Sequence, residues 1–185
     1  MKAPTIVAVL LVFIAAAASA VKVGPARTQA IAMVVLHSTG GPTCDALTGK
    51  PVWVGAGSLH ANMQHIEAHP KLGIHYMIDR DGSLRSSVPE DQVAHHVFKH
   101  SAASIAIELI NDGDGLDPFT EPQLDALVEL LRDIAHRRGI ARTGIKRHSD
   151  LDHSMLSCAK HRRRKVDPGA AFPFQAVLDR VFQAN

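Results

Sequence analysis

The sequence lacks a large net charge, a rich set of cysteines and any internal repeat. A formal charge of +2 at pH 7 gives no reason to expect a general binder of polyanions, and we expect no nucleic-acid partner. Only two cysteines are present, so the chain can form at most one internal disulfide. Without repeats or an interdomain linker, and with 46% hydrophobic residues, the 185 residues suit a single domain with a sizeable core.

Histidine, in contrast, is present in excess, with twelve residues. Because histidine is a common metal ligand and proton carrier at neutral pH, this excess favours a metal or acid–base site, although it does not locate one. Charge is also distributed unevenly. Residues 160–165 read KHRRRK and form a local cationic patch, which as a pattern is typical of a solvated loop.

The first twenty residues have the pattern of a secretory signal peptide. Lys2 precedes an apolar stretch over residues 6–18, and Ala18-Ser19-Ala20 is a small-x-small cleavage site. An uncleaved anchor is the alternative, but the stretch is short for a membrane span. We therefore expect a signal peptide at 1–20, a mature domain at 21–185 with no stable membrane span, and export to the periplasm or the medium.

Export bears on the two cysteines, Cys44 and Cys158. In an oxidising compartment they could form a disulfide. Two buried thiols, or one cysteine acting as a metal ligand, are the alternatives that the sequence leaves open.

Hydrophobic patterning predicts a single α/β domain. Continuous apolar runs predict buried strands at residues 30–39 and 104–110, and a shorter strand ends near His148. Alternation around Asp81-Gly82 predicts a hairpin, and GGPT at 40–43 predicts a loop. Helices are predicted over 58–68, from a capping box of Thr120 and Gln123 to Gly139, and near the C-terminus around Phe174, Val177, Leu178 and Val181.

Strand ends point to one set of metal ligands. A catalytic zinc site takes three protein ligands and leaves its fourth position to water. His37 and His148 both follow apolar strands, and the ends of strands on one edge of a sheet converge. Asp167 lies in a turn marked by Pro168-Gly169, so a His, His, Asp set is plausible. Asp167 in a solvated ion pair with its cationic neighbours is the alternative.

Two local patterns compete with this set. HIEAH places His65 and His69 four residues apart on one helix face, but Glu67 lies at the wrong position for a metalloprotease H-E-x-x-H helix and points away from both histidines. NDGDGLD at 111–117 is acidic but lacks the spacing of a calcium-binding loop. A surface helix face and an ordinary polar loop are the simpler interpretations.

Six motifs taken in order resemble the zinc-dependent N-acetylmuramoyl-L-alanine amidases, whose fold is shared with peptidoglycan recognition proteins. They are VVLHSTGG, IHYMIDRDGSL, the HH pair at 95 and 96, SIAIEL, RHSD and KVDPGAAF, and together they span residues 33 to about 182. Each motif is weak alone, but six in the right order are specific. The resemblance implies a single domain with a central mixed β-sheet flanked by helices.

The same resemblance implies the site. The family's zinc ligands fall on His37, His148 and Asp167, its catalytic glutamate on Glu108 and its oxyanion-stabilising lysine on Lys165. It implies Zn²⁺ as the cofactor, peptidoglycan or a muropeptide as the substrate, and hydrolysis of the amide between N-acetylmuramic acid and L-alanine. We expect a monomer. The cationic run at 162–164 could contact anionic stem peptides or wall polymers.

The chain departs from the family pattern at three places. His96 matches a histidine that lines the substrate groove, but His95 stands where a tryptophan is often found. Ile74 stands where some phage relatives carry a catalytic tyrosine. The segment between His148 and Asp167 is expanded and leaves Cys158 as a rival third ligand.

Two other functions compete with the amidase. A non-catalytic peptidoglycan-binding module of the same fold is the first, although such proteins usually lack a complete ligand set. A metallopeptidase using His65 and His69 is the second, and it would cut between amino acids.

Overall fold

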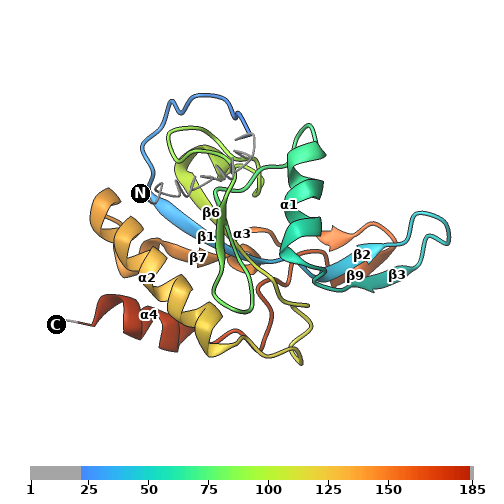
Figure 1. Ribbon diagram of the computed structural model, residues 1–185. Helices are drawn as coiled ribbons and strands as arrows, with labels where there is room; N and C mark the ends of the chain where they lie inside the picture. Colours follow the sequence, from blue (N-terminus) through green and yellow to red (C-terminus); the bar gives the residue numbers. More distant parts are fainter. Residues whose placement is uncertain (1–21, 184–185) are drawn as a thin grey trace, which may run out of the picture.

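The protein is built on a five-stranded mixed sheet, seen in a computed structural model that describes residues 22–183 (Figure 1). The strand order is β5-β4-β6-β1-β7, and only β5 runs antiparallel to its neighbour. The sheet strands are β1 (Met33–Ser38), β4 (Tyr76–Ile78), β5 (Leu84–Ser86), β6 (Ser104–Leu109) and β7 (Ile145–Arg147). The helices are α1 (Leu59–Ala68), α2 (Glu121–Arg138), α3 (His148–Leu151) and α4 (Phe174–Phe182), with 3₁₀ turns at Ser101–Ala103 and Arg142–Gly144.

Helices cover both faces of this sheet and create two apolar layers. The larger layer packs α2 and α4, which lie side by side in Figure 1, against the central strands, with Leu36, Ile107 and Leu127 fully buried. The smaller layer packs α1 on the opposite face through Met63 and Ile66. Because the central strands are parallel and buried on both sides, they read in sequence as continuous apolar runs.

The predicted α/β elements are confirmed, although the strand expected at 30–39 is shorter, at Met33–Ser38. Ser58 caps α1 by accepting from the Ala61 N–H, and Thr120 caps α2 by accepting from the Gln123 N–H. Gly139 ends α2 with a φ of 65°. One detail is wrong. The Gln123 side chain does not complete a capping box, because it donates instead to the carbonyls of Ile78 and Ile110 and so joins α2 to the sheet.

The expected loop at 40–43 is wrong as well, because most of it is a strand. β2 (Gly41–Cys44) pairs with β3 (Pro51–Val54) in an antiparallel hairpin. A second small hairpin, β8 (Met155–Leu156) with β9 (Ala159–Arg163), lies beside it. The two hairpins, residues 41–54 and 155–163, extend together from the sheet as a two-hairpin arm (Figure 1). The alternation of apolar and polar residues that marks a strand is weak here, because the arm buries few side chains.

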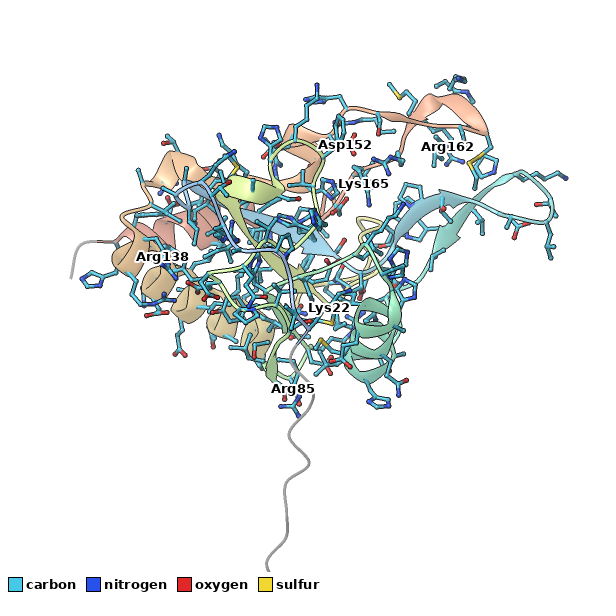
Figure 2. The ribbon with its side chains drawn as sticks, turned by 90° about the horizontal axis from the view of Figure 1, so that it is seen from above. Lys22, Arg85, Arg138, Asp152, Arg162 and Lys165 are labelled. Carbon is cyan, nitrogen blue, oxygen red and sulfur yellow. A yellow bond between two sulfur atoms is a disulfide. The ribbon has the colours of Figure 1, made fainter. Side chains whose placement is uncertain are left out.

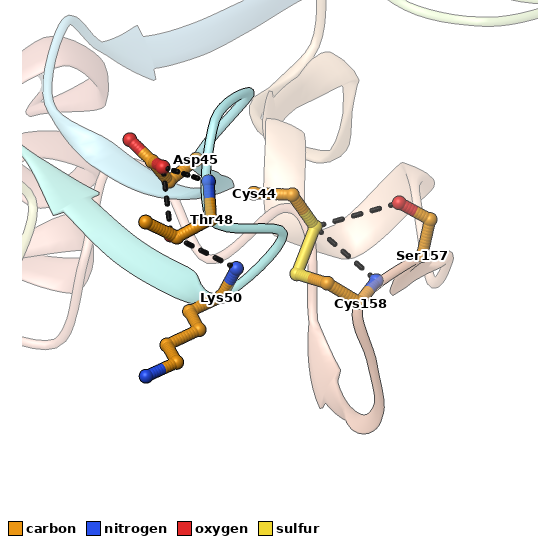
Figure 3. The surroundings of a disulfide bond; sticks show 6 residues. All are labelled: Cys44, Asp45, Thr48, Lys50, Ser157 and Cys158. Atoms are coloured by element: carbon orange, nitrogen blue, oxygen red, sulfur yellow. Dashed lines mark hydrogen bonds between the residues drawn. A yellow bond between two sulfur atoms is a disulfide. The ribbon is translucent and has the colours of Figure 1, made fainter.

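A disulfide between Cys44 and Cys158 joins the two hairpins (Figure 3). It links the last residue of β2 to the turn between β8 and β9. The pairing removes Cys158 as a rival metal ligand, and with it the alternatives of free thiols.

The predicted signal peptide, residues 1–20, lies outside the described residues. Among residues 22–183, no helix has both the length and the apolar character needed to cross a bilayer.

Candidate metal centre

The structure brings His37, His148 and Asp167 together at one edge of the sheet. His37 is the fifth residue of β1, and His148 begins α3 directly after β7. Since β1 and β7 are adjacent and parallel, their carboxyl ends meet at the same edge. Asp167 arrives from the segment that returns from the arm. In the described part of the chain, these three residues are the one group of histidine, cysteine and acidic side chains that could hold a metal ion.

The distances among the three side chains suit a small metal ion. His37 Nδ1 lies 2.9 Å from His148 Nδ1 and 3.2 Å from Asp167 Oδ2, and His148 Nδ1 lies 2.9 Å from the same oxygen. Bonds of about 2.0–2.2 Å in a tetrahedral zinc site would place ligand atoms about 3.4 Å apart. The three atoms therefore need to move apart by only a few tenths of an ångström to hold such an ion.

The protonation states of these side chains also favour a cation. Burial lowers the pKa of His37 to about 4, outweighing the opposing effect of its bond to Asp167. Burial raises the pKa of Asp167, but the side-chain contacts with His148 and His37 outweigh burial and hold that pKa well below its usual range. At neutral pH, His37 therefore offers a neutral nitrogen and Asp167 an ionised oxygen, which are the forms that bind metals.

Backbone contacts fix the position of Asp167. Its carbonyl accepts from the Ser149 N–H at 3.0 Å, next to His148. Gly169, with a φ of 97°, then packs so closely on Gly113 that a Cβ there would lie 2.6 Å from the Gly113 carbonyl oxygen. Glycine is thus required on both grounds, conformation and space.

A chain of hydrogen bonds sets the tautomer of His37. The Ser104 hydroxyl donates to the His100 carbonyl at 2.8 Å, so the hydroxyl oxygen accepts from His96 Nε2 at 3.0 Å. His96 Nδ1 is then an acceptor, and it accepts from His37 Nε2 at 2.9 Å. With its hydrogen on Nε2, His37 directs the lone pair of Nδ1 toward His148 and Asp167. A partner that orients a metal-binding imidazole in this way is typical of metal sites.

The outer nitrogen of His148 faces an acidic group. Its Nε2 lies 3.9 Å from Asp152 Oδ2, and Asp152 also pairs with Arg164. Neither Ser104 nor Asp152 was singled out in the sequence. Asp152 lies four residues after His148, which is the only local signal that could have pointed to it.

Glu108 lies next to the three side chains because of strand register. It pairs with His37 in the parallel ladder between β6 and β1. Burial raises the pKa of Glu108 to about 8, with the negative charge of Asp167 adding to the rise and Lys165 opposing it. Carboxyl groups whose pKa is shifted this far from its ordinary value are common at functional sites.

One cavity connects all of these groups. It has a volume of about 450 Å³, and its lining includes His37, His96, Glu108, His148, Lys165 and Asp167. His95 and Ile74 also line the cavity: His95 is exposed, and Ile74 belongs to the apolar layer beneath α1. The cavity therefore presents a carboxyl group and an ammonium group on the same space as the three candidate ligands.

The competing local patterns have other roles. His69 Nδ1 accepts from the Lys71 and Leu72 N–H groups just beyond α1, and His65 and His69 are not part of a three-ligand group among residues 22–183. In the acidic loop, Asp114 accepts from two backbone N–H groups and Asp117 pairs with Arg80. His69 and the acidic loop thus have structural roles, while His65 is one of the residues that line the cavity.

The class of protein defined here is an α/β domain that brings His, His and Asp side chains together at one edge of its sheet. The sequence profile of N-acetylmuramoyl-L-alanine amidases matches residues 27–170, and the chain belongs to this family. Comparison with curated protein sequences gave no match.

Solved structures share the fold. AmiD from E. coli, in a complex with the substrate anhydro-N-acetylmuramic acid-L-Ala-D-γ-Glu-L-Lys, superimposes with a TM-score of 0.64 at 22% identity over 86% of this chain. The matched region spans 61% of the AmiD chain. LysC from Clostridium intestinale (TM-score 0.55, 20% identity, 84% of this chain and 94% of that chain) and Drosophila PGRP-SA (0.55, 15%, 82% and 80%) are also similar.

Proposed function

We propose that the protein is a zinc-dependent enzyme that hydrolyses the amide between N-acetylmuramic acid and L-alanine in peptidoglycan or muropeptides. The observation that carries this proposal is that three ligand atoms, a carboxyl group and an ammonium group line one cavity in a chain of the amidase family. The activity named for the family and the muropeptide bound to AmiD indicate the bond to be cut.

The donor set fits zinc. Two imidazole nitrogens and one carboxylate oxygen are common zinc ligands, and a site of three protein ligands leaves the fourth position open to the cavity. The tautomer of His37 also fits a metal site, because its Nδ1 lone pair is directed at the other two ligand atoms. We therefore assign His37, His148 and Asp167 as zinc ligands.

When bound there, zinc would polarise the substrate carbonyl and acidify a water molecule. Glu108 takes the proton of the attacking water and delivers it to the leaving amine of L-alanine. The raised pKa of Glu108 suits its role as the acid that protonates the amine. A nearby divalent cation would lower that pKa, which suits its role as the base that deprotonates water. Lys165 stabilises the oxyanion, since its ammonium group meets negative charge that develops only in the transition state.

His96 has two roles in this proposal. Its side chain lines the cavity, where it can contact substrate, and its Nδ1 accepts the hydrogen of His37 Nε2.

We also assign the enzyme to the exported proteins, with cleavage after residue 20, a monomeric mature chain and no nucleic-acid partner. The disulfide supports this location, because such bonds persist in oxidising compartments.

The direct test is mass spectrometry of the products formed from purified peptidoglycan by residues 21–185, with added zinc and with a chelator. Free stem peptides beginning at L-alanine, lost with the chelator and restored by zinc, are the expected result. Asp167→Ala should lose both zinc and product. Peptides cut between amino acids would instead indicate a metallopeptidase, and intact wall material that retains the protein would indicate a binding module.

A further inference from the structure

The outer strand of the two-hairpin arm has a cationic surface that the proposed chemistry does not use. Residues 153–166 contain five lysine or arginine residues and no aspartate or glutamate. Side chains alternate along a strand, so Lys160 and Arg162 of β9 share the face opposite to that of the buried Ala159. Both are exposed. We call these two residues the arm cations.

The other three cations of this segment have partners or a place in the site. Arg163 donates to the carbonyls of Ser149 and Asp152 at 2.6 and 2.9 Å. Arg164 pairs with Asp152 at 2.5 Å and, like Lys165, lines the cavity. The side chains of the arm cations form no hydrogen bond or ion pair with another of residues 22–183. Their charge is therefore available to a ligand.

The arm cations lie farther from the candidate metal centre than Lys165 does. Figure 2 shows Arg162 toward the outer end of the arm and Lys165 where the same segment returns to the sheet. Arg164 and Lys165 line the cavity, while the arm cations are not among its lining residues. Of these four cations, a ligand small enough for the cavity would contact only Arg164 and Lys165. A ligand must extend out of the cavity to reach the arm cations.

The disulfide holds this surface in place. Cys158 lies in the turn between β8 and β9, and its bond to Cys44 ties that turn to the first hairpin. Lys160 follows Cys158 by two residues. Binding groups whose backbone is already fixed lose less conformational entropy when they engage a partner.

We infer that Lys160 and Arg162 bind carboxylates of neighbouring stem peptides in polymeric peptidoglycan, and that the protein acts on the polymer in preference to single muropeptides. This inference rests on the proposed function. A γ-linked glutamate leaves its α-carboxyl group free, so each stem peptide of this kind carries an anion, and a polymer presents such anions repeatedly. Two unpaired cations on the arm, outside the cavity, complement that arrangement in charge and in reach.

The test compares Lys160→Gln/Arg162→Gln with the control Arg85→Gln/Arg132→Gln. The control removes the same charge from β5 and α2, away from the arm. Turnover is measured on insoluble peptidoglycan and on a soluble anhydro-muramyl tripeptide, each at low and high salt. We expect the arm variant to lose about tenfold in kcat/KM on the polymer only, with a weaker salt dependence, and the control to match the wild type.

Equal losses on both substrates, or no loss on the polymer, would overturn the inference. Cosedimentation with the polymer in a Glu108→Gln background separates this failure from failure of the proposed function. If the wild-type protein cleaves neither substrate, weaker cosedimentation of the arm variant still supports polymer binding, and unchanged cosedimentation rejects it. Vesicles of phosphatidylglycerol form a last comparison: binding that needs both arm cations, with polymer turnover unchanged, would assign the surface to a membrane instead.

Discussion

His37 and Glu108 stand opposite each other in the parallel register of β1 and β6. Directly before them, Leu36 pairs with Ile107, and both of these side chains are fully buried. The apolar layer therefore fixes the register, and the register places a candidate ligand beside a candidate proton carrier. A slip of one residue would turn every side chain of the strand to the other face and separate the two groups.

Replacing Glu108 with Gln tests its chemical role. The amide keeps the shape of the side chain but cannot take a proton from water, so turnover should fall by about 10²–10⁴-fold. Zinc content, measured by atomic absorption after gel filtration, should be unchanged because Glu108 is not among the three proposed ligands. Glu129→Gln, on an exposed site of α2, is the matched control and should keep full activity. Full activity in Glu108→Gln would contradict the assignment.

The hydrogen-bond chain behind His37 predicts an effect on metal affinity. Ser104→Ala removes the acceptor of the His96 ring hydrogen, so His37 is no longer held in one tautomer. Zinc affinity, measured by chelator competition, should fall about 10–100-fold.

The control for this variant is Ser87→Ala. Ser87 is also a buried serine, and its hydroxyl has no partner within the described chain. Its loss should leave zinc affinity unchanged. Equal affinity in both variants would show that His96 does not orient His37.

Gly169→Ala tests the close packing beside Asp167. A methyl group there would meet the Gly113 carbonyl at 2.6 Å, in a backbone conformation that side chains rarely adopt. Unfolding free energy should fall by about 1–3 kcal/mol, and zinc affinity should fall with it. Gly139→Ala is the comparison, because Gly139 also has a positive φ but open space around it. It should cost about 1 kcal/mol without changing zinc affinity.

Glu90 predicts a pH dependence of stability away from the site. Burial raises the pKa of Glu90, but hydrogen bonds from Arg137, Tyr76 and Arg138 outweigh it and lower the pKa to about 2. The folded pKa lies below the ordinary value of 4.5, so ionised Glu90 stabilises the fold above pH 4.5. This contribution is lost as the pH falls from 4.5 toward 2.

The measurement is urea unfolding of the wild-type protein and Glu90→Gln between pH 7 and pH 2.5. At pH 7 the variant should be less stable by about 1–3 kcal/mol. The difference between the two proteins should shrink through the acid window, which isolates Glu90 from the other acidic groups. A difference that stays constant with pH would contradict the assignment.

The sequence predicted the sheet and the helices well because their apolar runs and caps are local signals. Residues 30–39 and 104–110 read as buried strands, and Thr120 and Gly139 marked the ends of α2. Convergence of His37 and His148 followed from two strand ends on one edge. Asp167 was a weaker candidate, from the turn at Pro168-Gly169, and only the resemblance to the family favoured it over a solvated ion pair, because a ligand in a turn has no periodic pattern around it.

The arm and the groups behind the ligands were not predicted. β2 and β9 bury few side chains, so neither shows the alternation that marks a strand in sequence. Ser104 is an ordinary buried residue at the start of β6 until its contact with His96 is known. Contacts of this kind depend on how distant segments pack, which one sequence does not reveal.

The three candidate ligands come from positions 37, 148 and 167, so they meet only after both ends of the domain have come together. Strand β1 has the same requirement, since Val34 pairs with Ile105 on one side and Ile145 on the other. Contacts so distant in sequence form late and slowly. A chain that stops short of residue 167 lacks one of the three candidate ligands, whatever else it has folded. Under the proposed function, metal uptake would mark a completed domain, and partly made molecules could not carry out the proposed hydrolysis.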